Sequence, residues 1–411
     1  MSEWTSGYVS ELGYTYGYYS ELGTSQIAFL LALQGWHAPN VKTALELGYG
    51  QGVSINIHAA SNDVEWWGTD FNPSQAAFAM NLSEASQSGV TLYDDAFHEL
   101  LSRQDLPVFD FICLHGIWSW ISEQNRAVII DLIKDKLAVG GVVYVSYNTL
   151  PGWSGFAPLR HLMTAHANTL SSEGTGLAGR IEGAIGFAEE VLELKPNYLK
   201  SFPAATSRVD SLKKQSRHYL AHEYFNKDWH PMHFGNMAEL MSSAKLQYAG
   251  PADFLSTVDA INVSPEQKAF LNKISDTHFR ESVRDFMTNM QFRKDYWIKG
   301  PRKLNQSEHF RIIREQEIVL VAPLDEINLK VSGARGEMEL QASIYEPVLQ
   351  SLADHKPRKI GDIESELCGS GSQGSAIEWP QLVQAITVLL GKGNVRLAIN
   401  PGASAAIQRQ T

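Results

Sequence analysis

Residues 43–53 read TALELGYGQGV, a strand-like run that leads into a glycine-rich turn and then into the start of a helix. Glycine suits such a turn because the backbone must bend sharply and a ligand can approach a residue that has no Cβ. Val53 stands where a dinucleotide-binding fingerprint has its third glycine, which argues against a pyrophosphate ligand. Glu46, at the end of the strand, suits a cationic ammonium or sulfonium group. A tight strand-to-helix turn without a ligand is the alternative interpretation.

The sequence around this turn alternates short apolar runs with amphipathic stretches. We expect strands at 43–48, 65–70, 91–95, 109–116 and 142–148, and helices at 53–60, 73–87, 97–103 and 123–137. This alternation is typical of right-handed crossovers that build a parallel sheet. The predicted fold class is therefore α/β, Rossmann-like and doubly wound.

The pattern changes after residue 151. Residues 155–300 read almost entirely as helix, at 156–170, 176–194, 207–225, 234–246, 264–275 and 277–297. The sequence near 315–345 is strand-like again, and it is followed by predicted helices at 344–354, 360–367 and 380–392 and a strand at 394–399. Three helices that end in a strand predict a winged-helix-like α+β domain. We therefore divide the chain into an N-terminal aromatic arm or lid (1–24), the α/β domain (25–170), a helical middle domain (171–300) and a C-terminal α+β domain (301–411).

Composition narrows the functional classes. The 411 residues carry a net charge of −11, and such an acidic chain predicts no nucleic-acid partner. Two cysteines, Cys113 and Cys368, can build neither a disulfide framework nor a thiolate metal site. The histidines at 218, 222, 230 and 233 do not form an HExxH motif, so we predict no metal. Without a secretory signal or an apolar run of bilayer length, we expect a cytoplasmic protein that is not inserted in a membrane.

Asp70 closes the second predicted strand, 22 residues after Gly48. A carboxylate at that distance can accept hydrogen bonds from both hydroxyls of a ribose. The alternative is a cap for the helix that begins at Pro73, a role for which Asn72 is better placed. The site we predict here is one for a nucleoside.

Asp95 lies at the end of the third predicted strand, with Ala96 and Phe97 directly after it. Its carboxylate could accept a hydrogen bond from an adenine amino group while Phe97 or Phe71 packs on the ring. The alternative interpretation makes Asp95 the N-cap of the helix at 97–103. Both roles can coexist.

The fourth predicted strand ends in FDFICLHGIWSWIS (109–122), which places His115 before Trp118 and Trp120. Open α/β sheets bind ligands at the carboxyl ends of their strands, so a polar residue followed by aromatic residues predicts a substrate site there. A buried histidine whose hydrogen bonds are satisfied within the core is the alternative.

Several of these stretches resemble one family: GYVSELGYTYGYYSELG (7–23), LELGYGQGVS (45–54), GTDFNPSQAAFA (68–79), LHGIWSWIS (114–122) and VYVSYNTLPGW (143–153). It is the family of bacterial class I S-adenosylmethionine-dependent methyltransferases with a methyltransferase regulatory domain, which includes rickettsial protein-lysine methyltransferases. The stretch HYLAHEYFNKDWHPMHFGNMAELMSSAKLQYAG (218–250) is similar to the regulatory domain. The resemblance covers roughly residues 1–300.

This resemblance implies a seven-stranded methyltransferase sheet and S-adenosylmethionine as the cofactor. The residues that would bind the methionine part are Glu46, Gly48, Tyr49, Gly50 and Gly52. Asp70 would hold the ribose, Asp95, Ala96, Phe97 and Phe71 would meet the adenine, and His115 would lie beside the transfer site. The N-terminal arm with Tyr14, Tyr16, Tyr18 and Tyr19 would fold over the pocket as a lid, or would only staple a terminal helix to the core.

We therefore expect a methyltransferase that N-methylates lysine side chains of a protein substrate, which the helical and C-terminal domains would dock. Aromatic walls attract a sulfonium or ammonium cation and exclude water, and a lysine must first lose its proton. The candidates for this wall and proton acceptor are His115, Tyr14, Tyr18, Trp118, Trp120, Tyr147 and Asn148. A small-molecule or glycan O-methyltransferase with His115 as base is the alternative, and a non-catalytic scaffold is a second one. The oligomeric state stays open, and a homodimer is one alternative.

Overall fold

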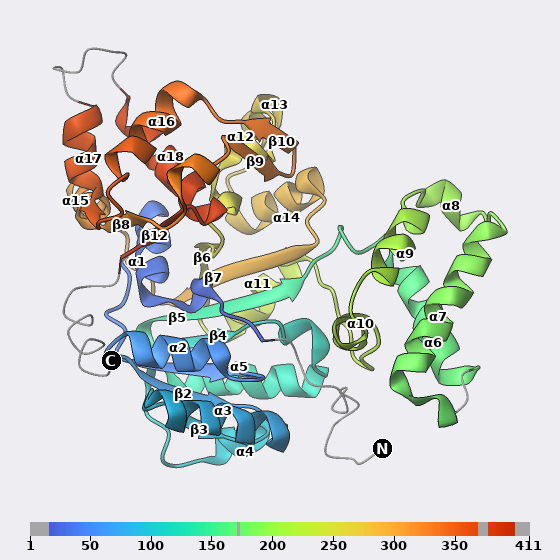
Figure 1. Cartoon of the computed structure of the whole chain (residues 1–411). Helices are drawn as coiled ribbons and strands as arrows, with labels where there is room; N and C mark the ends of the chain where they lie inside the picture. The colour runs from blue at the N-terminus through green and yellow to red at the C-terminus, as the bar shows by residue number, and fades with distance from the viewer. Residues whose placement is uncertain (1–15, 171–172, 369–376, 399–411) are drawn as a thin grey trace.

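The computed structural model describes residues 16–170, 173–368 and 377–398 (Figure 1). A seven-stranded sheet runs through the molecule in the order β3-β2-β1-β4-β5-β7-β6. The strands are β1 (Thr43–Leu47), β2 (Glu65–Thr69), β3 (Thr91–Tyr93), β4 (Phe109–Leu114), β5 (Leu137–Asn148), β6 (Leu246–Pro251) and β7 (Phe292–Lys299). The first five pair in parallel, whereas β7 is antiparallel to both β5 and β6. The predicted Rossmann-like α/β sheet is confirmed.

Helices cover both faces of this sheet, because its strands are apolar on both sides. Along β4, Phe111 and Cys113 belong to one core cluster, whereas Ile112 and Leu114 belong to the other. The first face is covered by α1 (Thr24–Leu33), α2 (Val53–Ser61) and α3 (Pro73–Ser86). The second face is covered by α4 (Phe97–Ser102), α5 (Glu123–Lys136) and α11 (Phe234–Ser243). The carboxyl ends of the parallel strands stay free of these helices and are available for a site.

The expectation of nearly continuous helix from 155 to 300 is wrong in two places. Residues 246–251 and 292–299 form β6 and β7, and α14 (Thr277–Thr288) ends well before residue 297. Asn289 follows α14 in the left-handed conformation, with φ 48°, and stops the helix. The strand β7 is hard to recognise because it carries Arg293 and Asp295, which pair with each other inside the protein. Because these residues are charged, the segment lacks the continuous apolar run that is typical of a buried strand.

A lobe of helices stands beside the sheet at the end toward which β5 points (Figure 1). It consists of α6 (Ala157–Thr169), α7 (Gly176–Glu193), α8 (Tyr198–Ser201), α9 (Ala205–Lys213) and α10 (Arg217–Tyr224). These helices pack around a core of their own, which includes Met163, Ile181 and Leu220. We call residues 153–229 the helical lobe.

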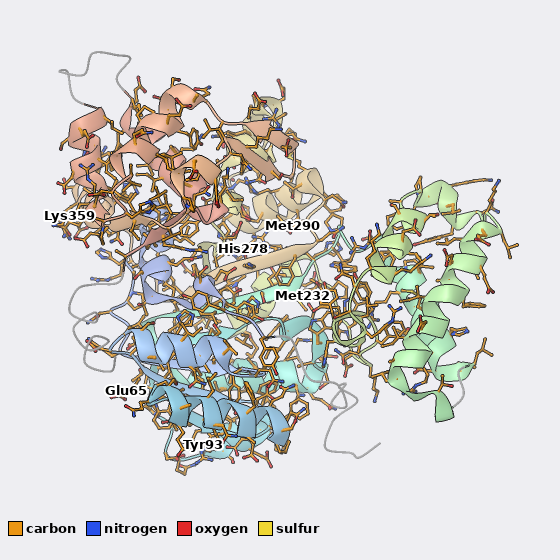
Figure 2. All side chains as sticks on the ribbon, in the orientation of Figure 1. Glu65, Tyr93, Met232, His278, Met290 and Lys359 are labelled. Atoms are coloured by element: carbon orange, nitrogen blue, oxygen red, sulfur yellow. The ribbon has the colours of Figure 1, made fainter. Side chains whose placement is uncertain are left out.

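The two ends of the helical lobe leave the sheet side by side. Leu150 N–H donates to the carbonyl oxygen of Met232 over 3.1 Å, and Gly152 N–H donates to that of Met290 over 3.0 Å. Met232 and Met290 are labelled in Figure 2, where the lobe joins the rest of the molecule. The lobe is therefore an insertion: the chain leaves the sheet after β5 and returns to the same sheet with β6 and β7.

The remaining elements form a layer at the β6 side and the C-terminus. They are α12 (Asp259–Asn262), α13 (Pro265–Leu271), α15 (Gln306–Glu315), β8 (Glu317–Leu320), β9 (Lys330–Gly333), β10 (Gly336–Glu339), α16 (Ala342–Ser351), β11 (Arg358–Lys359), α17 (Ile360–Leu367), α18 (Trp379–Lys392) and β12 (Val395–Leu397). The three predicted C-terminal helices and the strand after them are confirmed. The winged-helix likeness and the four domain boundaries stay predictions. Within the described ranges, no helix combines the length and the apolar character that crossing a bilayer requires.

Candidate active site

A small pocket opens at the carboxyl end of β1. Its walls come from the end of β1, from the loop that leads into α2, from the end of β4 and from the chain before α1. The lining residues are Gly17, Tyr19, Glu46, Gly48, Tyr49, Gly50, Gln51, Gly52, Val53 and His115. Six of the predicted cofactor residues thus lie around one cavity.

The glycines of the loop have backbone angles that other residues rarely adopt. Gly48, Gly50 and Gly52 have φ values of +72°, +57° and +69°. A Cβ on Gly52 would lie only 2.4 Å from the Cβ of Ala79 in α3. Gly52 therefore allows α2 to begin directly at the pocket while α3 packs closely against it.

Asp70 follows β2 and supports this loop. Its carboxylate accepts hydrogen bonds from Gly50 N–H over 2.8 Å and from Asn72 N–H over 3.0 Å. Burial raises the pKa of Asp70 to about 6, although the two backbone hydrogen bonds act in the opposite direction. The helix-cap role belongs to Asn72, whose side chain accepts from Ser74 N–H over 3.0 Å. Each oxygen of Asp70 keeps a free lone pair, as the predicted ribose contact requires.

Glu46 is 2% exposed, and its Oε2 atom has no hydrogen-bond partner among the described residues. Burial, with a further contribution from Asp70, raises the pKa of Glu46 to about 8. A buried polar atom without a partner is rare in folded proteins and costs free energy. The donor that would satisfy Glu46 must come from the pocket, so this carboxylate fits the cationic amino-acid end of S-adenosylmethionine.

His115 directly follows β4 and lines the same pocket. Its Nδ1 atom is 2.8 Å from the hydroxyl oxygen of Tyr144, and its ring stacks on that of Tyr19 with 3.5 Å between the centroids. Burial, helped by Lys294, lowers the pKa of His115 to about 3. The imidazole is therefore neutral at physiological pH.

Residues 16–23, which we call the strap, cross the pocket before α1. Tyr19 N–H donates to Ser54 Oγ over 3.2 Å, and His58 Nε2 donates to the carbonyl oxygen of Tyr19 over 2.9 Å. Farther along, Glu21 forms an ion pair with Lys294 of β7. The strap is thus tied to α2 on one side and to β7 on the other.

The predicted lid tyrosines have different positions. Tyr14 lies outside the described residues. Tyr16 and Tyr18 are mostly exposed, and their rings pack beside Phe78 and His58, as the staple alternative expects. Tyr18 is not part of the pocket wall, whereas Tyr19 is.

Two members of the predicted aromatic wall lie elsewhere. Trp118, in the 3₁₀ turn η3 (Trp118–Trp120), is fully buried in the core cluster that contains α5. Tyr147 belongs to the same cluster, and its hydroxyl donates to Asp295 over 2.8 Å. Both side chains occupy the face of the sheet opposite to Tyr144, so their predicted place in the wall is corrected. For Tyr147 the physical reason is the alternation of side chains along β5, whereas Trp118 lies in the turn after β4.

Trp120 and Asn148 lie where the helical lobe meets the sheet. The Trp120 ring is 6.4 Å from that of Trp229, between centroids. The Asn148 N–H donates to Ser119 Oγ over 2.8 Å, and its carbonyl oxygen accepts from Met232 N–H over 3.1 Å. Neither residue lines the pocket.

The predicted adenine contacts lie one strand farther away, beside β3. The Asp95 carboxylate is 2.9 Å from Arg103 Nη1, and the N-cap of α4 is Ala96, whose N–H donates to Glu99 over 2.8 Å. The N-cap alternative for Asp95 is therefore wrong. Phe71 and Phe97 are half-buried and do not line the pocket. The adenine contacts stay a prediction.

Sequence reasoning missed Glu223 on α10. Burial raises the pKa of its carboxyl group to about 7. Burial also raises the pKa of the Tyr19 hydroxyl to about 12, with contributions from Glu46, Glu21 and Glu223. Glu223 does not line the pocket. Its sequence context offers no signal that distinguishes it from the other acidic residues.

The sheet order, the antiparallel β7, the glycine loop after β1 and the acidic residue after β2 together define the class I methyltransferase fold. A family model described as a predicted methyltransferase regulatory domain matches residues 216–299. The protein sll1526 of Synechocystis is 38% identical over 413 residues, which cover 99% of this chain and 80% of that protein. A Rickettsia prowazekii protein is 27% identical over 74% of this chain and 55% of its own length. The structure of PKMT2 from Rickettsia typhi in complex with AdoHcy matches with a TM-score of 0.71 at 18% identity, over 94% of this chain and 77% of that one.

The chain therefore belongs to the same family as the Synechocystis protein sll1526, and it combines the class I methyltransferase fold with a region that matches the predicted methyltransferase regulatory domain.

Proposed function

We propose that this protein transfers a methyl group from S-adenosylmethionine to the side-chain amine of lysine in a protein substrate. The observation that carries the proposal is the carboxyl group of Glu46, which lines the pocket and is buried with one oxygen atom unpartnered among the described residues. A cation beside it would favour its ionised form, which suits the sulfonium donor and the ammonium form of the acceptor.

The residues of the pocket and those at the ends of the neighbouring strands β2 and β3 fit the cofactor. Glu46 and the backbone of the glycine loop would hold its amino-acid part, Asp70 the ribose, and the backbone at Asp95 and Ala96 the adenine. When bound, the cofactor supplies a methyl group on a positively charged sulfur. His115 and Tyr19, stacked at 3.5 Å, exclude water from the side of the pocket that the acceptor would approach.

A lysine acceptor must be neutral when it attacks. A carboxyl group with a pKa near the working pH is suited to accept the ammonium proton, and the pKa of Glu223 is about 7. Tyr19 stays protonated because its pKa is about 12, so its ring can contact a cation without becoming a base itself. The helical lobe, which supplies Glu223, and the C-terminal elements are the parts that would dock the protein substrate.

O-methylation of a small molecule or glycan would require His115 to act as a base. With a pKa of about 3, a Tyr144 hydroxyl at Nδ1 and Tyr19 over one ring face, this imidazole is a poor proton acceptor. The neutral His115 therefore favours an amine acceptor over an alcohol.

The test uses S-adenosylmethionine with a deuterated methyl group, the purified protein and a bacterial lysate. We expect mass spectrometry to find the label on lysine side chains. Glu223→Gln should lower the rate by about 10²-fold or more and should remove the rise of the rate through pH 7. Glu189→Gln, on the outer surface of the lobe, is the matched control and should leave the rate unchanged. Label found only in methyl ethers or esters of small molecules would contradict the proposal.

A further inference from the structure

A second pocket lies at the β6 edge of the sheet, far along the chain from the glycine loop. It has a volume of about 360 Å³ and lies between β6, α12, α13 and α14. All its lining residues except Gln34, Trp36 and Lys303 fall within residues 216–299, the part matched by the regulatory-domain family. We call it the basic pocket, because cationic side chains predominate among its charged residues.

Four cationic side chains line the basic pocket: Lys268, Arg280, Arg284 and Lys303. Two acidic side chains, Asp259 and Glu281, accompany them, so the lining has two more positive than negative groups. The chain as a whole has a net charge of −11. A positive cavity in an acidic protein concentrates small anions from solution.

Both acidic side chains already form ion pairs with cationic side chains. Asp259 lies 2.5 Å from Arg284 Nη1 and 3.4 Å from Lys268 Nζ. Glu281 lies 3.0 Å from Arg293 Nη2, and it accepts a hydrogen bond from the Tyr248 hydroxyl over 3.3 Å. Within the described ranges, Arg280 and Lys303 therefore have no carboxylate partner.

Lys303 is held in place although it has no counterion. Its Nζ atom lies 3.4 Å from the centroid of the Trp36 ring. The indole is fixed by its N–H, which donates to the carbonyl oxygen of Ala249 over 3.0 Å. Partial burial lowers the pKa of Lys303, so an anion beside its ammonium group would relieve an electrostatic cost.

We propose that the basic pocket binds a small polyanion, a metabolite with two or more phosphate or carboxylate groups close together. Arg280, on α14, can present its planar donor group to the ligand. It lies one helical turn from Arg284, which is bonded to Asp259 and to the carbonyl oxygen of Ser256. Lys303 contributes a point charge next to the flat face of Trp36. Asn272 and Thr277 add neutral hydrogen-bonding groups to the lining. This site is separate from the pocket of Glu46 and shares no lining residue with it.

The experiment is isothermal titration of the full chain with sodium pyrophosphate, and separately with citrate, at low ionic strength. We expect saturable binding of at least one of them, and the stronger of the two tells whether phosphate or carboxylate groups are preferred. Arg280→Gln and Lys303→Gln should each weaken the affinity about tenfold, the loss of one charge-assisted contact. Neither residue forms an ion pair within the described ranges, so both variants should fold.

Arg311→Gln is the matched control, because it removes one positive charge from α15, where Arg311 pairs with Glu315 at the surface. It should leave the affinity for pyrophosphate unchanged. Binding of neither anion at millimolar concentration would overturn the proposal, and so would an equal loss of affinity in Arg311→Gln. All three variants should keep their affinity for S-adenosylmethionine, so failure of the basic pocket is distinguishable from failure of the proposed function.

Discussion

The carboxyl group of Glu46 makes the stability of the protein depend on the pH of the solution. Its pKa is about 8 in the folded protein, against an ordinary value of 4.5. Between these values the folded chain holds a proton that the unfolded chain has released. Glu46 therefore makes its full contribution to the stability of the unliganded protein below pH 4.5, and this contribution is lost as the pH rises through 8. Asp70, with a pKa of about 6, acts in the same direction over a narrower window.

A bound cation reverses this preference, because it favours the ionised form of Glu46. We expect the affinity for S-adenosylmethionine to rise with pH up to about 8, by at most about tenfold per unit. Titrations in buffers of different ionisation enthalpy should detect proton release on binding. Glu46→Gln should bind more weakly and without this proton release. An unchanged pH dependence in Glu46→Gln would show that another group titrates.

The residues of the pocket differ in how well the sequence predicts them. The glycine loop, Glu46 and Asp70 were predictable because strand, turn and helix follow one another within 28 residues. Tyr147 was misplaced because its direction depends on the face of the sheet that its position in β5 meets, and Trp118 because the turn after β4 directs it into the core. Glu223 was missed, because its burial depends on the packing of the helical lobe, which no local pattern indicates.

At the scale of elements, the contact of α2 with α3 depends on the absence of a side chain at Gly52. Gly52→Ala would combine a strained φ of +69° with a Cβ 2.4 Å from that of Ala79. Gly89→Ala is the matched control, since Gly89 has a φ of +71° and open space around the same position. We expect Gly89→Ala to lower the free energy of unfolding by about 1 kcal/mol and Gly52→Ala by roughly 2–4 kcal/mol, because only the latter adds overpacking.

Urea denaturation without ligand measures both values. Equal losses in the two variants would mean that α2 and α3 separate at little cost, and that the conformation of the loop alone requires glycine.

The elements β6 and β7 show why local patterns predicted only part of the sheet. The five parallel strands alternate with helices, and this order is visible in the sequence. The strand β7 instead pairs with β5 across more than 140 positions. Its Arg293 is bonded to Glu281, Asp285 and Asp295, partners that are recognised only once the chain has folded. A segment with buried charged residues lacks the apolar pattern by which a strand is recognised in the sequence.

At the scale of the whole molecule, one sheet is built from two distant parts of the chain. Residues 43–148 supply β1 to β5, residues 246–299 supply β6 and β7, and the helical lobe is inserted between them. The strand β7 covers β5 along seven paired positions, from Val142 to Asn148. A fragment that ends at Thr149 would leave this edge of β5 unpaired and would uncover the core residues that contact Trp297. We therefore expect that fragment to remain unfolded.

Removal of the helical lobe alone should have a different result. Because Leu150 and Met232 are joined by a hydrogen bond, residues 153–229 can be replaced by a short Gly-Ser linker without stretching the chain. The lobe also takes its own hydrophobic core with it, so little apolar surface of the sheet is newly exposed. We expect this variant to unfold cooperatively on heating and to bind S-adenosylmethionine with an affinity close to that of the full chain, since Glu46, the glycine loop and Asp70 remain. Transfer to protein lysine should fall by about 10²-fold or more, because Glu223 and the docking surface are lost. Calorimetry measures the affinity for S-adenosylmethionine, and the labelled-methyl assay separately measures transfer to protein lysine. Full activity on protein without the lobe would remove α10 from the acceptor site, and a folded, cofactor-binding fragment ending at Thr149 would show that β6 and β7 are dispensable.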